Sequence, residues 1–461
     1  MNSLEKTRFF SQFQSAKVKI STSPVLFEQV LNPSLLRELI KKHEIDFRIR
    51  FFCPVTTLWV FLTQILNQDR SCRAAVAYFL STLKSKLCSL GTGAYCQARK
   101  RLKESFLQEL FQIQSQQLQQ AVPPEWLWRG KKIKLVDGTT VSMPDTTDNQ
   151  LHFPASNREK NLVEFPLARV VVVICKTTGV LINAAIGTYQ GKGSGETSLL
   201  KDLMSSFKPG DLVVFDRYYA GFFTLARLIV NGIDTVTRQH HLRKATLVKR
   251  LGKNDHLFKV KKPQKPKDMS VKEYDSFPEK ILLRRIKIVI QQPGFRVKKM
   301  ELITSLIDET FLTTDVAELY RYRWFVEVDI RSIKSAMGMD ILRCKTAEMV
   351  RKEIFANFLA YNLVRTVMID AAKINGDKPR ALSFKATLQL IFSFRNQMAL
   401  CYGLAWSRLY FNILAQLKGQ RVGKRPDRYE PRAKKRRPPP NLLYLRAPRH
   451  QARKNCLKKA S

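Results

Sequence analysis

The sequence predicts an α/β protein built around a mixed sheet, and three observations carry that prediction. Near Lys131 the apolar residues change from helical spacing to the alternation of strands. Several strand-like segments then precede a helix, a short apolar strand and another helix. A basic, strand-rich stretch interrupted by prolines follows, and the chain then returns to helix. With 461 residues, the chain is long enough for two to four domains.

Residues 1–128 are predicted to form a helical domain. Asn32-Pro33-Ser34 is typical of a helix start, because Asn caps a helix and Pro fits its first turn. Residues 56–66 and 94–118 also have apolar residues at helical spacing. Short helices joined by glycine-rich breaks suit a domain that reads DNA ends. A helical bundle with a basic solvent-exposed face fits the same residues, and both interpretations stay open.

Residues 129–235 are predicted to form the first part of the α/β core. The expected strands are 133–136, 139–142, 167–175, 180–186 and 212–215, with helices at 196–203 and 221–230. The segment 212–215 is short and wholly apolar, which is typical of a central strand that is buried on both faces.

Residues 236–299 are predicted to be an inserted β-rich subdomain, because they are basic and carry several prolines. Its clearest strands are 281–283 and 286–290, which Arg284 and Arg285 separate. Residues 300–415 are predicted to complete the core with a strand at 300–308, a helix at 316–337 and further helices.

The charge of the chain predicts a polyanionic partner. There are 80 Lys and Arg against 38 Asp and Glu, which gives a net charge of +42. Residues 416–461 hold 16 of those cations and only two acids, a net of +14 without helical periodicity. We expect a disordered basic tail that binds phosphates without reading sequence, the alternative being a tail that only increases solubility.

Targeting and cysteine patterns favour a reducing compartment. The first residues lack the apolar core of a signal peptide, and the apolar run 170–175 is too short to span a bilayer. The eight cysteines form no Cys-x-x-Cys pair, so neither a disulfide framework nor a zinc ribbon is expected. We expect a cytoplasmic protein, with double-stranded DNA as its partner and no membrane contact.

Two acids follow strands that are expected to be neighbours. Asp137 comes after the strand 133–136, and Asp216 comes after the strand 212–215. In an open α/β sheet the active site lies beyond the carboxyl ends of the strands, so the two acids are expected to converge. Alternatively, Asp137-Gly138 is a hairpin turn and Asp216 caps a helix.

A third acid lies in a row of polar residues on the helix 316–337. At about 100° per residue, the row falls within a sector of roughly 60° beside the apolar stripe of the helix. The row consists of Tyr320, Arg323, Glu327 and Lys334. It would hold a carboxylate against the sheet, with two cations and a phenol able to bind phosphates. A structural ladder of salt bridges is the alternative.

The same row resembles a known family. Tyr320-x2-Arg323-x3-Glu327-x6-Lys334 is similar, position for position, to the Tyr-Arg-Glu-Lys signature of a large group of bacterial insertion-sequence transposases. Residues 135–139 and 213–219 resemble its first and second aspartate motifs, and Gly195-Glu196-Thr197 also resembles the family. The resemblance spans about 131–345. It implies a DDE enzyme with a ribonuclease-H-like catalytic fold and an inserted β subdomain in the interval between Asp216 and Glu327.

The resemblance also implies a mechanism of cut-and-paste transposition. Asp137, Asp216 and Glu327 would be the catalytic acids and would hold two Mg²⁺ ions, for which Mn²⁺ could substitute, because hard oxygen ligands suit these metals. Transposon-end phosphates would be held by Tyr320, Arg323 and Lys334, with help from Arg217. Trp324 would stack on an unpaired base, or else it is a half-buried core residue. Synapsis of two ends implies a homodimer on DNA.

Two other functions are compatible with the same residues. A ribonuclease-H-like nuclease or junction resolvase would share the carboxylates, although the long insertion argues against a minimal nuclease. An inactive DNA-binding relic or repressor would keep the fold, but its expected mark is the loss of an acid, and all three acids are present.

Overall fold

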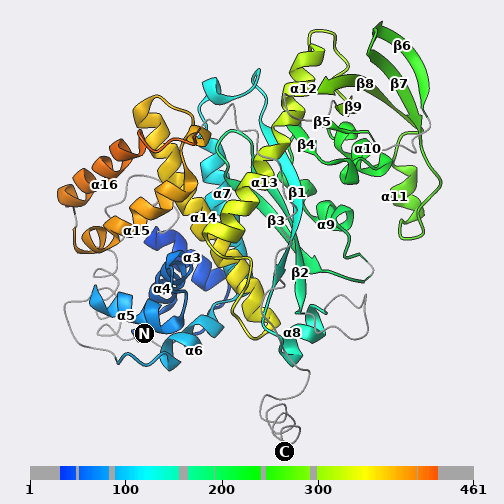
Figure 1. Ribbon diagram of the computed structural model, residues 1–461. Helices are drawn as coiled ribbons and strands as arrows, with labels where there is room; N and C mark the ends of the chain where they lie inside the picture. The colour runs from blue at the N-terminus through cyan, green and yellow to red at the C-terminus, as the bar shows by residue number, and fades with distance from the viewer. Residues whose placement is uncertain are drawn as a thin grey trace, which may run out of the picture.

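The computed structural model describes residues 32–47, 51–82, 89–154, 165–191, 193–239, 245–290, 298–401 and 403–423. Within them, helices cover both faces of one large mixed sheet, which confirms the predicted α/β class (Figure 1). Among the helices of these segments, none combines the length and the apolar character that crossing a membrane requires.

The sheet has nine strands in the order β3-β2-β1-β4-β5-β9-β8-β7-β6. Their bounds are β1 Ile133–Ser142, β2 Leu167–Cys175, β3 Leu181–Thr188, β4 Leu212–Phe215, β5 Asp234–Arg238, β6 Thr246–Gly252, β7 Asp255–Lys261, β8 Lys280–Ile290 and β9 Lys298–Thr304. The pairs β1–β4 and β4–β5 are parallel and the other neighbours are antiparallel.

Alternate residues of the central strands enter two separate apolar cores. In β2, Val170 and Val172 pack into the core that contains α14, whereas Val171 and Val173 pack into the core that contains α9 and α10. All four valines are at most 1% exposed. Successive side chains of a strand point to opposite faces, so a sheet covered on both sides needs such a continuous apolar run.

The helices divide between the two faces of the sheet. The face with the larger core carries α7 (Glu104–Gln120), α12 (Thr313–Arg321), α13 (Arg323–Arg331) and α14 (Ala347–Asn375). The opposite face carries α9 (Glu196–Asp202) and α10 (Phe222–Val230). In Figure 1, α12 and α13 run diagonally across the front of the strands, and α14 lies beside them.

Helices also account for most of the described residues outside the sheet. They are α3 Pro33–Lys42, α4 Pro54–Leu66, α5 Cys72–Ser81, α6 Gly93–Arg101, α8 Thr147–His152, α11 Val271–Asp275, α15 Phe384–Leu400 and α16 Gly403–Leu417. The predicted cap is confirmed, since the side chain of Asn32 accepts a hydrogen bond from Ser34 N. The helix expected at 94–118 is two helices, because Leu102 is extended and buried between α6 and α7.

Two strand predictions were wrong in the same way, since each predicted pair of strands is one strand. Strand β1 continues through Asp137 and Gly138, which pair with Val172 and Val171 of β2. Strand β8 continues through Arg284, whose guanidinium is buried and donates to Asp255 Oδ1 at 2.8 Å and to Asp255 Oδ2. A buried Arg that is paired in this way does not interrupt a strand.

The helix expected at 316–337 is broken into three parts. Helices α12 and α13 meet at Tyr322, where Phe325 N donates to Tyr322 O, a tighter turn than that of an α-helix. Residues Ser332–Ala336 form a π-helical turn, in which Met337 N donates to Ser332 O at 3.0 Å. This wider turn changes the direction of side chains beyond it.

The predicted domain boundaries stay predictions. Strands β6, β7 and β8, which lie within the predicted inserted subdomain, extend the sheet beyond β9. Most of the predicted basic tail, from residue 424 onward, lies outside the described residues, as do the first 31 residues of the N-terminal domain.

The contact between α14 and α16 predicts a pH dependence of stability. Burial raises the pKa of Asp370 to about 6, although Tyr410 Oη donates a hydrogen bond to its Oδ2 at 2.8 Å. In the unfolded chain Asp ionises near pH 4. Between about pH 4 and pH 6 the folded protein therefore binds the extra proton, so this group's contribution to stability falls as the pH rises. In urea unfolding, the wild type should lose stability relative to Asp370→Asn across this window. Parallel profiles for the two proteins would contradict the prediction.

Candidate active site

Parallel pairing of β1 and β4 brings Asp137 and Asp216 together. The paired residues end at Val136 and Phe215, so each Asp is the first residue beyond the pairing. The prediction that Asp137 ends its strand was wrong, because β1 continues along β2 to Ser142. The sheet is nevertheless open beside Asp137 on the β4 side, which is the position expected of an active site.

The alternation of the strands directs both carboxylates toward α13. Leu135 in β1 and Val214 in β4 enter the core beneath α12 and α13. Asp137 and Asp216 each follow two positions later, so their side chains share that face. Helix α13 packs directly on β1 and presents Glu327 there.

Arg323 connects the acids. Its Nη1 lies 2.7 Å from Glu327 Oε1 and 4.0 Å from Asp137 Oδ2. Burial alone would lower the pKa of Arg323, but the hydrogen bond to Glu327 and the charge of nearby Asp216 raise it. Tyr320 lies close as well, with the guanidinium carbon 6.0 Å from its ring centre. The structure therefore brings Tyr320, Arg323 and all three acids into one cluster.

Asp137 has a strongly perturbed ionisation. Burial raises its pKa to about 6, with further increases from the charges of Glu196 and Glu327. The backbone N–H of Gly138 and the charge of Arg323 oppose that increase. A carboxyl group surrounded by other carboxylates binds cations well, because a cation removes their mutual repulsion.

Asp216 also caps a helical turn. Its Oδ1 accepts a hydrogen bond from Arg217 N at 2.7 Å, at the start of the 3₁₀ turn Arg217–Tyr219. Asp216 can therefore cap this turn and still lie beside Asp137, so the two roles predicted for it do not exclude each other. Arg217 itself is exposed, and so is Trp324, 53% of whose surface is accessible beside the Arg323 guanidinium.

Lys334 is separated from the acids. Its Nζ donates to Thr140 O at 2.8 Å and pairs with Asp340 at 3.1 Å, so it lies over the far end of β1. The π-helical turn that contains Lys334 breaks the regular row predicted for this helix. The cation still borders the same strand as Asp137, only three residues beyond it.

The donor atoms fit a hard divalent cation. Carboxylate oxygens are the ligands that Mg²⁺ and Mn²⁺ prefer, and the guanidinium of Arg323 stands as a positive charge between two of these groups. Within the residues that the structure describes, no three His, Cys, Asp or Glu side chains are close enough together to hold a metal ion as they stand. A metal ion bound by the three acids would therefore require these side chains to rearrange.

Comparison with known proteins identifies the family of the chain. Residues 128–363 match the model of the transposase DDE domain, a segment that covers half of the chain and contains all three acids. The chain belongs to the DDE transposase family. It is 28% identical to the Escherichia coli K12 transposase InsG for insertion sequence element IS4. The aligned segment of 373 residues covers 78% of this chain and 80% of that protein.

Shorter similarities point to the same family. Over 101 residues the chain is 32% identical to the putative E. coli K12 transposase InsL for insertion sequence element IS186A. These residues cover 20% of this chain and 27% of that protein. The E. coli transposase for insertion sequence element IS421 shows the same identity over the same number of residues. The chain is therefore a transposase, a DNA-cleaving enzyme, as the sequence predicted.

One residue near the transposase site was not predicted as part of it. The carboxylate of Glu196, at the start of α9, lies against Gly138, where an added Cβ would come within 2.7 Å of its Oε2. Glu196 was noted only as part of the segment Gly195-Glu196-Thr197. The signal that could have identified it is the glycine after the first Asp, since glycine permits a close approach.

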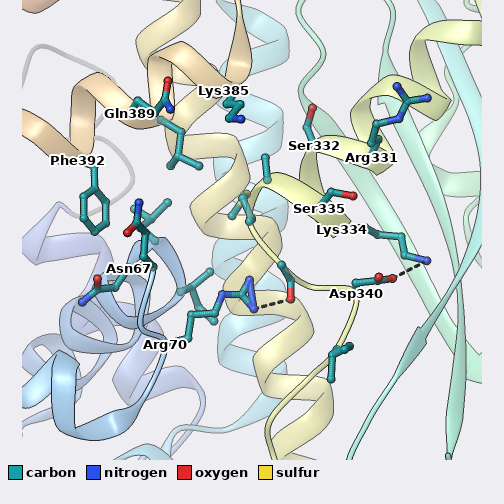
Figure 2. Close-up of a pocket in the computed structure, with 18 of the residues that line it drawn as sticks. Asn67, Arg70, Arg331, Ser332, Lys334, Ser335, Asp340, Lys385, Gln389 and Phe392 are labelled. Atoms are coloured by element: carbon teal, nitrogen blue, oxygen red, sulfur yellow. Dashed lines mark hydrogen bonds and ion pairs between the residues drawn. The ribbon is translucent and has the colours of Figure 1, made fainter. Parts of the chain in front are cut away.

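A cavity of about 960 Å³ lies beside α13 and the π-helical turn that follows it. It is lined by the end of α4, the π-helical turn and α15, and it contains one acid, Asp340 (Figure 2). Its basic residues are Arg70, Arg331, Lys334, Arg343 and Lys385. Arg70 is 7% exposed; its Nη1 donates to Gly338 O at 2.7 Å, and its Nη2 has no partner among the described residues.

Proposed function

We propose that this transposase cuts DNA at the ends of a mobile element with Asp137, Asp216 and Glu327 as its catalytic acids. The observation that carries the proposal is the meeting of these acids around Arg323, at the opening of the sheet beside β4. Two strands and a helix hold them there, and all three lie within the segment that matches the DDE domain. We propose a ribonuclease-H-like core for the same reason.

The three acids would hold divalent cations, which we propose to be two Mg²⁺ ions. When bound, such ions activate an attacking water or DNA hydroxyl and stabilise the leaving oxygen. Asp137 would be mostly ionised at neutral pH, because its pKa is about 6. Arg323 would leave the carboxylates and pair with a DNA phosphate, an exchange of one anionic partner for another.

The DNA contacts follow from the exposed groups around the acids. Tyr320 and Arg323 border the acids, while Arg217 and Trp324 lie on the surface next to them. We propose that the two arginines bind phosphates of the transposon end and that Trp324 stacks on a base. Two copies of the chain would act together, one at each end.

The direct test is cleavage of a duplex that carries the element's terminal repeats. Purified full-length protein with Mg²⁺ should cut the strand at the junction between the repeat and the flanking DNA, and chelation of the metal should stop cleavage. Binding without cleavage in Mg²⁺ and in Mn²⁺ would favour an inactive DNA-binding relic. Equal cleavage of a duplex without the repeats would favour a nuclease.

The cavity predicts the path of the bound DNA strand. Lys334 borders both β1 and the cavity, so a strand that leaves the acids would continue along its cations. Replacing exposed Arg331 and Lys385 together by alanine should weaken binding to a terminal-repeat duplex. The slope of log affinity against log salt should become shallower by about one to two. The variant neutralises fewer phosphates, so its binding releases fewer counterions.

A matched control removes two cations far from the cavity. Lys208 precedes β4 and Lys272 lies in α11, and both are exposed. Their double alanine variant should keep most of the affinity and the wild-type slope. If both double variants change the salt dependence equally, the cavity has no special role in binding.

A further inference from the structure

We infer that Glu196 is a fourth carboxylate of the active site and a ligand of the divalent cation held beside Asp137. The inference rests on the proposed function, since it assumes that the cation binds at Asp137. It adds a residue from α9, on the face of the sheet opposite α13, to a site built from β1, β4 and α13.

The first observation is the close fit between Glu196 and Gly138. An added Cβ at position 138 would overlap the carboxylate of Glu196 where it lies here, so a side chain at this position would displace that carboxylate. The φ angle of Gly138 is not positive, so backbone conformation does not require a glycine there. The missing side chain instead lets a carboxylate reach the backbone immediately after Asp137.

The second observation is the opening of the sheet at this point. Beyond Phe215, β4 no longer pairs with β1, so among the described residues no strand pairs with Asp137 and Gly138 on that side. Carboxylates from both faces can reach such a gap, Asp137 from the α13 face and Glu196 from the α9 face.

The third observation is how Glu196 is held. The buried phenol of Tyr219 donates to Glu196 Oε2 at 2.8 Å, and Arg169 Nη1 donates to Ser194 O at 2.8 Å in the segment before α9. No Lys or Arg of the described residues forms a salt bridge with Glu196. A carboxylate that a hydrogen bond fixes near a second acid is a favourable ligand for a metal ion.

The test measures Mn²⁺ binding by the full-length protein without DNA, using calorimetry or electron paramagnetic resonance. Glu196→Gln keeps an oxygen that can accept the Tyr219 hydrogen bond but removes the charge, so Mn²⁺ affinity should fall by about 10-fold or more. Tyr219→Phe removes the hydrogen bond and keeps the charge, so its affinity should fall much less. Wild-type Mn²⁺ affinity in Glu196→Gln would overturn the inference.

Two further measurements separate the inference from its alternatives. Without metal, Glu196→Gln should be at least as resistant to thermal unfolding as the wild type, because it removes a like charge beside Asp137. A marked loss of stability would indicate a purely structural role and would overturn the inference. If Asp137→Asn also keeps full Mn²⁺ affinity, the proposed function itself fails; if only Glu196→Gln keeps it, the inference alone fails.

A glycine substitution provides an independent check. Gly138→Ala should lower Mn²⁺ affinity although every acid is still present, because the new methyl group displaces Glu196. In a Glu196→Ala background the same change should add little, since the space is then vacant. Equal, additive losses in the two backgrounds would show that Gly138 acts independently of Glu196 and would contradict the proposed contact.

Discussion

Replacing any one of Asp137, Asp216 and Glu327 by alanine is expected to abolish DNA cleavage while DNA binding survives. Metal-ion catalysis contributes several kcal/mol to such reactions, and each 1.36 kcal/mol is a factor of ten in rate. We therefore expect losses of roughly a thousandfold or more for each single variant. Cleavage of a labelled terminal-repeat duplex in Mg²⁺ measures the rate, and gel retardation measures the binding.

A control acid from the same helical segment sharpens this test. Glu318 is exposed and accepts a hydrogen bond from Tyr322, away from the three acids. Glu318→Ala should keep cleavage close to the wild-type rate. Persistent cleavage in Glu327→Ala would refute the site assignment. Loss of binding together with cleavage in all three variants would instead point to a failure of folding.

The second large effect is expected on stability, at Asp329. This side chain is completely buried, and its carboxylate pairs with Arg365 and with Arg380, whose Nη2 lies 2.7 Å from Oδ2. Asp329→Asn would leave the buried Arg365 without its charge partner. Breaking a buried pair in this way costs about 3–5 kcal/mol, so the denaturant midpoint should fall markedly.

An exposed ion pair provides the matched control. Glu309 pairs with Lys249 at 2.9 Å, and both side chains are mostly exposed. Glu309→Ala also removes one negative charge, but its effect on the unfolding free energy should stay within about 0.5 kcal/mol. If Asp329→Asn unfolds at the same denaturant concentration as Glu309→Ala, the buried network does not stabilise the fold.

The spacing of Arg323 and Glu327 predicted that they share one face of a helix, and the two side chains pair, because residues four apart return to the same face of an α-helix. The same rule failed for Lys334, since a π-helical turn lies between and the sequence carries no clear mark of it. The convergence of Asp137 and Asp216 was also predictable, because parallel neighbours end at one edge of a sheet.

Other features depend on contacts between distant segments. Arg284 looked like an interruption because its partner Asp255 lies in another strand. The approach of Glu196 to Gly138 joins two faces of the sheet, which local periodicity cannot relate. The cavity likewise combines α4, the π-helical turn and α15, which are far apart in the chain.

The position of Arg323 has a consequence for how this enzyme is made. Its guanidinium pairs with Glu327 and lowers the repulsion at Asp137, so part of the negative charge of the acids is balanced without a metal ion. We therefore expect the chain to fold without a bound metal ion and to become active in a separate step. Activity would then require two ligands together: a divalent cation bound by the carboxylates and a DNA phosphate bound by Arg323.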